Sequence, residues 1–106
     1  MTRKHFEVRE TAVTIIAEDE FLPIAERSIF RSREAVERYI EEDPFFQVTL
    51  EPYPCPPHAP EIVHRMCDAA LAAGVGPMAG VAGAIAERAV LDMRTAGASY
   101  AIVDNG

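Results

Sequence analysis

The sequence predicts an α+β fold, with three main helices and a mixed sheet made of one or two N-terminal strands and a C-terminal strand. Three observations lead to this prediction. Apolar and polar residues alternate near the N-terminus, the apolar period becomes helical from Leu22 onward, and the β-prone segment AIV closes the chain. We expect residues 1–106 to form a single domain or one half of a larger one, since a chain of this length can bury its own core.

The N-terminal strands are predicted from period-two alternation. Val13, Ile15 and Ala17 fall on one face of an extended segment that is rich in β-branched residues. The segment FFQVTL, residues 45–50, is also predicted as a short strand. The next ten residues, EPYPCPPHAP, include five prolines and are therefore predicted as an irregular loop.

The three helices are predicted from stripes of apolar residues at helical spacing. The first runs from Leu22 to Asp43 and ends there because Pro44 disfavours a helical conformation in the residue before it. The second opens at Pro60 and stops at Gly74, a residue that suits the left-handed conformation of a helix C-terminus. A tight turn over residues 74–76 then leads to a third helix that starts near Pro77.

Charge and composition narrow the classes of partner. The net charge of −7 at pH 7 argues against nucleic acid or an anionic membrane surface as a partner. No apolar run reaches the roughly 20 residues of a membrane span. The first ten residues have no apolar segment of the kind found in a signal peptide. We therefore expect a cytoplasmic protein.

The two cysteines predict neither a disulfide framework nor a zinc site. Cys55, His58, His64 and Cys67 are spaced C-x2-H-x5-H-x2-C, which differs from the paired spacings of structural zinc sites. Cys67 also falls on the apolar face of the second helix, where a thiol usually packs as a small hydrophobic group. We expect no zinc at these four residues.

The segment AAGVGPMAGVAGAIAE, residues 72–87, is rich in small side chains. Glycine inside a helix costs about 0.5–1 kcal/mol relative to alanine, so Gly80 and Gly83 need a compensating role. One such role is close packing against another helix or strand. The other is phosphate binding, because a glycine-rich turn that enters a helix presents N–H groups and a positive dipole end. The spacing matches no standard phosphate-binding motif, and both interpretations stay open.

Four longer segments are RETAVTIIAE, YIEEDPFF, GVGPMAGVAGAIAE and AIVDNG. Together they resemble an uncharacterised protein family related to the ApbE-like flavin transferases, over nearly the whole chain. ApbE-like enzymes carry a helix of the form A-K-G-x-x-x-D and then a strand that ends in N-x-G-G-[DN]. VAGAIAE followed by AIVDNG looks like this unit: Gly83 and Glu87 match the helical glycine and acid, and Asn105 and Gly106 match the strand-end turn. Ala82 stands where those enzymes have lysine.

The resemblance implies an ApbE-like half-fold, in which FAD is held at the helix start and the strand end. It also implies Mg²⁺-dependent transfer of FMN to a threonine hydroxyl of a target protein. The expected cofactor-binding residues are Gly74, Gly76, Pro77, Met78, Gly80, Gly83, Glu87, Asn105 and Gly106. The Asp- and Thr-bearing segment of those enzymes has no counterpart in these 106 residues, so we expect transfer only in a completed form and assign no catalytic residue.

Three classes of function therefore stay open. The first is a flavin- or nucleotide-binding protein, and the second is an enzyme that uses another small phosphorylated cofactor at the same helix start. The third is a non-catalytic assembly module whose small-residue helix face packs on itself or on a partner. An unpaired sheet edge is expected at the final strand, and covering such an edge favours a homo-oligomer.

Overall fold

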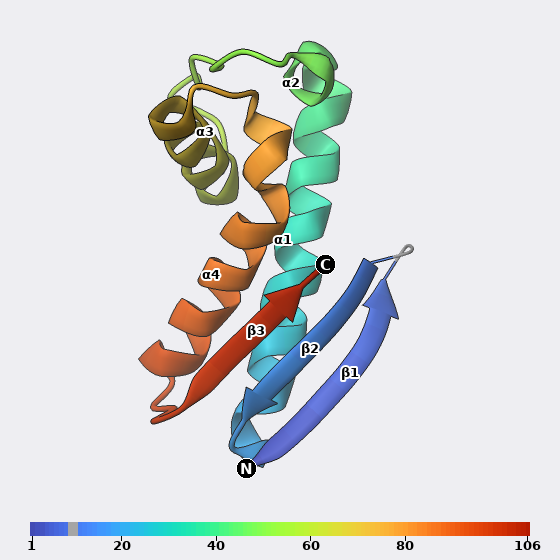
Figure 1. The fold of residues 1–106 in the computed structure, drawn as a ribbon, viewed down its shortest axis with the longest axis vertical. Helices are drawn as coiled ribbons and strands as arrows, with labels where there is room; N and C mark the ends of the chain where they lie inside the picture. The colour runs from blue at the N-terminus through green and yellow to red at the C-terminus, as the bar shows by residue number, and fades with distance from the viewer. Residues whose placement is uncertain (9–10) are drawn as a thin grey trace.

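A three-stranded sheet packs on one side of two long helices (Figure 1). The structure is a computed structural model that describes residues 1–8 and 11–106. The elements in chain order are β1 (Thr2–Val8), β2 (Thr11–Ala17), the 3-10 turn η1 (Asp19–Phe21), α1 (Leu22–Glu42), α2 (Phe45–Val48), α3 (Glu61–Ala73), the 3-10 turn η2 (Pro77–Gly80), α4 (Val81–Thr95) and β3 (Ala101–Asn105).

Strand β2 is the centre of the sheet, in the order β1-β2-β3. The α+β class is confirmed, but the expectation of a mixed sheet is wrong because both strand pairings are antiparallel. The chain runs up α1 and back down α4, so β3 begins at the end of the sheet where β2 stops (Figure 1). The register shows this directly, since Ala17 pairs with Ala101.

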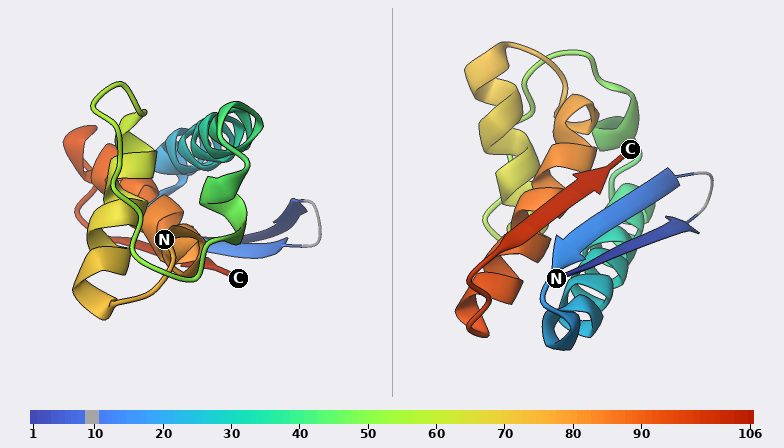
Figure 2. Two further views of the ribbon diagram at one scale, coloured as in Figure 1. Left: turned by 90° about the horizontal axis from the view of Figure 1, so that it is seen from above. Right: turned by 60° about the horizontal axis from the view of Figure 1, so that its bottom comes forward.

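The inner face of the sheet carries the alternating residues of β2. Val13, Ile15 and Ala17 are at most 1% exposed and pack against α1 and α4. Seen along the long axis, the strands lie along one side of the molecule and the helices lie on the other (Figure 2, left). The period-two prediction for this segment is therefore confirmed.

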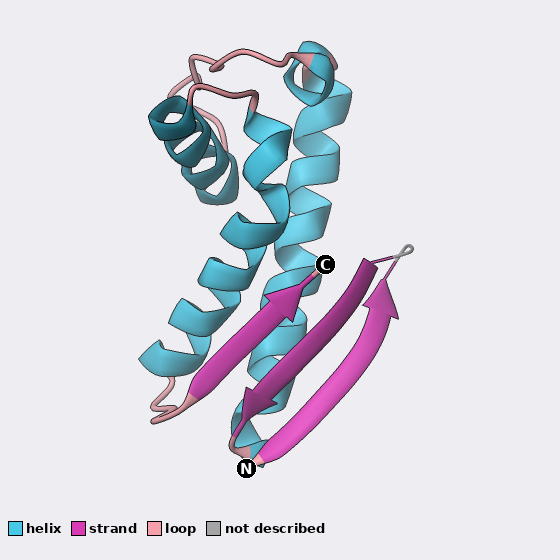
Figure 3. Ribbon diagram, in the orientation of Figure 1, coloured by secondary structure: helices cyan, strands magenta, loops and turns pink. Residues whose placement is uncertain are grey.

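The helices are longer than the strands that cover them. A helix of the length of α1 spans about 31 Å, whereas a strand of the length of β2 spans about 23 Å. The sheet therefore covers only part of the α1–α4 pair, and α2 and α3 gather at the opposite end (Figure 3). No single helix in the described residues is long and apolar enough to cross a membrane, although α3 with the η2–α4 segment, bent by 106°, meets the length and composition criteria as a pair.

The helix boundaries follow the predicted signals closely. Helix α1 ends one residue before Asp43, and Pro60 precedes the first residue of α3. Gly74 caps α3 with a φ of 71°, the left-handed conformation expected there. The third helix begins as predicted at Pro77, but its first turn is the 3-10 turn η2.

The short strand predicted over residues 45–50 is wrong, because residues 45–48 form the one-turn helix α2. Pro44 has a φ of −60° and continues a helical turn after α1 has ended. The aromatic ring of Phe46 is fully buried and packs edge-on against Tyr39 and Tyr53, with ring centroids 5.0 and 5.3 Å away. Burial of Phe46 between these rings decides the local conformation.

Candidate functional site

Three of the predicted binding residues form a packed turn. Gly74 ends α3 in a left-handed conformation, and Pro77 is fully buried. A Cβ atom added to Gly76 would lie 2.0 Å from the carbonyl oxygen of Thr49, so the two main chains are in direct contact. Gly74 therefore has a conformational role in this turn, whereas Gly76 and Pro77 have steric roles in its packing.

Met78 and Gly80 lie further along the same turn and also contact neighbouring elements. A Cβ atom on Gly80 would lie 3.8 Å from the Cβ of Ala69, an ordinary van der Waals distance, so this glycine faces α3 and its position has room for a methyl group. Met78 lines a groove of about 290 Å³ between α1, α2 and α4, together with Val36 and Ile40. The small-residue segment thus contacts α3 at Gly80 without a steric need for glycine there.

The predicted helix–strand unit is assembled at the end of β3. The side-chain N–H of Asn105 donates a hydrogen bond of 3.2 Å to the carbonyl of Ala82 on α4. Gly106 has a φ of 110°, and its N–H donates to the carbonyl of Ala12 at 2.9 Å. The Oδ1 atom of Asn105 is buried and has no hydrogen-bond partner among residues 1–8 and 11–106. A Cβ atom on Gly83 would meet nothing within 4 Å, so this part of α4 is bare.

A groove between α3 and α4, here called the α3–α4 groove, lies beside this bare surface. It has a volume of about 610 Å³ and is lined by Glu61, His64, Arg65, Asp68, Ala69 and Glu87. The Arg65 guanidinium bridges the carboxylates of Glu61 and Glu87 and so ties the two helices together. Glu87 follows Gly83 by four residues on the same side of α4, since both are exposed at helical spacing. Arg65 therefore supplies a cation to the α3–α4 groove.

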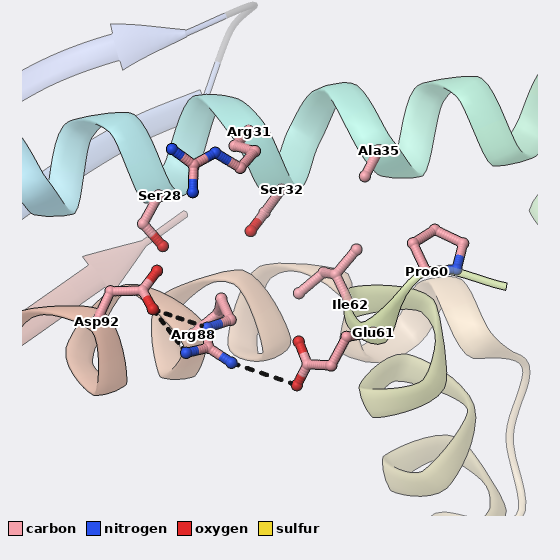
Figure 4. A pocket seen from close by; sticks show the side chains of 9 residues that line it. All are labelled: Ser28, Arg31, Ser32, Ala35, Pro60, Glu61, Ile62, Arg88 and Asp92. Atoms are coloured by element: carbon pink, nitrogen blue, oxygen red, sulfur yellow. Dashed lines mark hydrogen bonds and ion pairs between the residues drawn. The ribbon is translucent and has the colours of Figure 1, made fainter. Parts of the chain in front are cut away.

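A second polar hollow, here called the three-helix pocket, is formed by α1, α4 and the start of α3 (Figure 4). It has a volume of about 350 Å³ and is lined by Ser28, Arg31, Ser32, Ala35, Pro60, Glu61, Ile62, Arg88 and Asp92. Sequence reasoning missed this pocket. The available signal is the pair Ser28 and Ser32, two hydroxyls at i,i+4 spacing on the buried face of an otherwise apolar helix stripe.

The charges in the three-helix pocket are partly paired. Oδ1 of Asp92 accepts hydrogen bonds of 3.1 and 2.6 Å from Arg88, and a second Arg88 nitrogen lies 3.5 Å from Glu61. Burial raises the pKa of the Asp92 carboxyl, but the Ser28 hydroxyl and the Arg88 and Arg31 charges outweigh it, and the pKa lies below its usual value. Hydrogen bonding to Asp92 correspondingly raises the pKa of Arg88.

Three of the four cysteine and histidine residues considered for zinc line one hollow. Cys55, Cys67 and His64 line one hollow of about 380 Å³, and both cysteines are free thiols. Burial raises the pKa of Cys55, and it raises that of Cys67 to about 12, so both thiols are protonated at neutral pH. Among the described residues, no group of three or more His, Cys, Asp or Glu side chains is placed to hold a metal ion.

Comparison with known proteins shows the family. The family model described as AbpE bacteria matches residues 1–106. The chain belongs to this family. It is also similar to curated proteins named UPF0280 protein: it is 52% identical over 101 residues to one from Methanocella arvoryzae, covering 95% of this chain and 41% of that protein.

Two further relatives give the same result. A UPF0280 protein of Methanosphaerula palustris is 50% identical over 107 residues, and one of Archaeoglobus fulgidus is 49% identical over 107 residues. Each match covers 100% of this chain and 45% of the relative. The chain thus spans less than half the length of these relatives of the AbpE bacteria family, and their shared name states no activity.

Proposed function

We propose that this chain contributes a binding surface for a flavin nucleotide, formed by the bare part of α4 at Gly83 and the adjoining α3–α4 groove. The observation that carries the proposal is the empty space around Gly83, since nothing lies within 4 Å of the position of a Cβ atom there. A glycine inside a helix lowers the stability of the folded protein relative to alanine. Close approach of a ligand to the helix backbone is a function that would compensate for this loss.

The size and charge of the α3–α4 groove support this proposal. Its volume of about 610 Å³ is within the roughly 300–1,000 Å³ of small-molecule sites. Arg65 offers a guanidinium that can hold a phosphate in a bidentate manner, although Glu61 and Glu87 now occupy it. A nucleotide would therefore have to displace one of these carboxylates. Because no set of three ligands in the described residues suits a metal ion, the proposal covers binding and includes no step through Mg²⁺.

The test is calorimetric titration of FAD into the 106-residue chain, with and without Mg²⁺. We expect saturable binding that Gly83→Leu abolishes and Arg65→Gln weakens, while both variants keep the circular dichroism spectrum of the parent. Position 83 is open in the unliganded protein, since a Cβ atom there would meet nothing within 4 Å, so a loss of binding in a folded variant would reflect a blocked surface. Arg94→Gln, an exposed change in the last turn of α4, is the matched control. FAD binding that survives Gly83→Leu would place the ligand elsewhere.

A second candidate function is assembly, in which the small-residue face of α4 or a neighbouring apolar surface contacts another copy. The apolar surface surrounds the contact between Gly76 and Thr49, where Leu50 is 87%, Val48 66% and Val75 37% exposed. Apolar side chains gathered in this way are typical of interaction surfaces. Sedimentation of the parent, Gly83→Leu and Leu50→Glu separates the candidates, because an assembly module gives an oligomer that one of these variants dissociates and that FAD does not affect.

An enzyme that uses another phosphorylated cofactor would use the same groove. A thermal-shift panel of nucleotides and sugar phosphates tests this hypothesis, since only a compound that binds the native state raises the melting temperature of the protein. A shift with such a compound and none with FAD would favour it.

A further inference from the structure

The three-helix pocket shares Glu61 with the α3–α4 groove of the proposed function, but its other lining residues differ and it is smaller. Its volume of about 350 Å³ is near the lower limit of ligand sites, so it suits a small metabolite and excludes a dinucleotide. Its polar side chains come from three elements that are far apart in sequence, α1, α3 and α4 (Figure 4).

The α1 wall of the pocket presents two buried hydroxyl groups. Ser28 is 3% and Ser32 is 6% exposed, and both side chains point into the pocket (Figure 4). The Ser28 hydroxyl makes no hydrogen bond of normal geometry within the described residues and faces the Asp92 carboxylate, so a polar ligand or a water molecule can supply it with a better-placed acceptor. Arg31 lies between the two serines in sequence, is exposed, and makes no ion pair within the described part of the chain.

The opposite wall presents an acceptor. Only Oδ1 of Asp92 receives the two hydrogen bonds from Arg88, and the other carboxylate oxygen is turned toward Ser28 (Figure 4). Glu61 stands at the side of the pocket and interacts with Arg88 at 3.5 Å. The pocket therefore contains two guanidinium groups and two carboxylates.

This balance of charges selects the ligand class. A simple anion would gain from Arg31 but would be repelled by Asp92 and Glu61 in a protein whose net charge is −7. A simple cation would gain from Asp92 but would be repelled by both arginines. A molecule with one charge of each sign, held a few ångströms apart, matches both walls at once.

We propose that the three-helix pocket binds a small zwitterion of the α-amino acid class, with its carboxylate on Arg31 and the two serine hydroxyls and its ammonium on Asp92. The ligand carboxylate supplies the Ser28 hydroxyl with an acceptor at hydrogen-bond distance, while the ligand ammonium takes the Asp92 oxygen that faces Ser28. The residual volume beyond the polar walls, next to Ala35 and Ile62, accommodates a short apolar side chain.

The experiment is NMR titration of the ¹⁵N-labelled chain with L-alanine up to about 20 mM, with propionate and ethylamine as probes that each lack one charge. We expect saturable shifts confined to residues 28–32 and 88–92, and binding of either half-ligand that is weaker by about tenfold or more. Extension to a panel of amino acids then identifies the preferred side chain.

Two variants and a control make the assignment specific. Ser28→Ala removes a hydroxyl that makes no hydrogen bond of normal geometry within the described residues, and its circular dichroism spectrum is expected to match that of the parent. Arg31→Gln removes the exposed guanidinium. Each substitution is expected to weaken L-alanine binding about tenfold. Arg27→Gln, an exposed change one turn earlier on α1, is expected to leave it unchanged. The absence of saturable shifts across the amino acid panel, or binding that Arg31→Gln does not affect, overturns the proposal and leaves a buried water as the partner of Ser28.

Discussion

Replacement of Gly76 by alanine tests the closest approach of another segment to any glycine in the described part of the chain. The added Cβ would lie 2.0 Å from the carbonyl oxygen of Thr49 and 3.1 Å from the Cα of Leu50, and both are main-chain atoms that cannot rotate away. The backbone of Gly76, with φ −72° and ψ 156°, is one that alanine adopts freely. The cost of the change is therefore steric.

The size of the effect follows from two opposing contributions. Overpacking of a well-packed site costs about 1–3 kcal/mol, and a contact between two main chains belongs at the upper end of this range. Alanine also lowers the conformational entropy of the unfolded chain, which stabilises the folded protein by about 0.4–1 kcal/mol. We therefore expect Gly76→Ala to lower the free energy of unfolding by about 2 kcal/mol, which corresponds to a fall in Tm of about 8–16 °C in a domain of this size.

Urea denaturation followed by circular dichroism measures this loss, and Gly83→Ala is the matched control. The control site is open and lies within a helix, so the same change there should raise stability by about 0.5–1 kcal/mol. The two substitutions are chemically identical and are expected to have opposite signs. If Gly76→Ala is as stable as the parent, the close contact with Thr49 is not a feature of the folded protein in solution.

Three further substitutions or measurements test other contacts. Because the pKa of Asp92 is lowered in the folded state, this carboxylate stabilises the fold above its unfolded pKa of about 3.9, and the contribution is lost as pH falls through the lower folded value. Asp92→Asn should therefore lower the urea midpoint at pH 6 by more than at pH 2.5, and an equal loss at both would contradict the pairing with Arg88. Burial raises the pKa of Cys67 to about 12, so iodoacetamide at pH 8.5 should label it slowly in the native protein and rapidly in urea, whereas equal rates would show an accessible thiol. Tyr53→Phe removes hydrogen bonds to Asp43 and to the hydroxyl of Tyr39 and should cost about 1–3 kcal/mol, and an unchanged midpoint would show that these bonds contribute nothing.

The helices and β2 could be predicted because their signals are local. A repeated apolar stripe, Pro44 after α1 and a left-handed glycine after α3 define the helices without knowledge of the rest of the fold. The segment FFQV has no such signal, since four apolar or amide residues suit a strand and a helical turn equally well. Its conformation depends on Phe46 entering a space between two tyrosines, one of which follows in the chain.

The candidate site was harder to predict because one residue type serves several purposes in it. Gly74 supplies a left-handed conformation, Gly76 a main-chain contact, Gly80 a position that faces α3 and Gly83 an open surface. The sequence shows that small residues are concentrated here, but it cannot distinguish the reasons for these four glycines. Each reason depends on which segment of the folded chain lies next to that glycine. The three-helix pocket could not be predicted for a related reason, because the charged residues that line it together with Ser28 come in part from α3 and α4.

The position of β2 at the centre of the sheet also bears on the order of folding. Its partner β1 is adjacent in the chain, whereas its other partner, β3, is separated from it by residues 18–100. Closing so long a loop costs entropy that must be offset by contacts formed elsewhere, and pairings between distant segments slow folding. During synthesis, one edge of β2 consequently stays unpaired until residues 101–105 emerge, and α1 and α4 must form a platform on which the last strand can dock. The antiparallel pair β1–β2 and the long helix α1 are the parts able to form early, and β3, which the side chain of Asn105 ties to α4, joins them later.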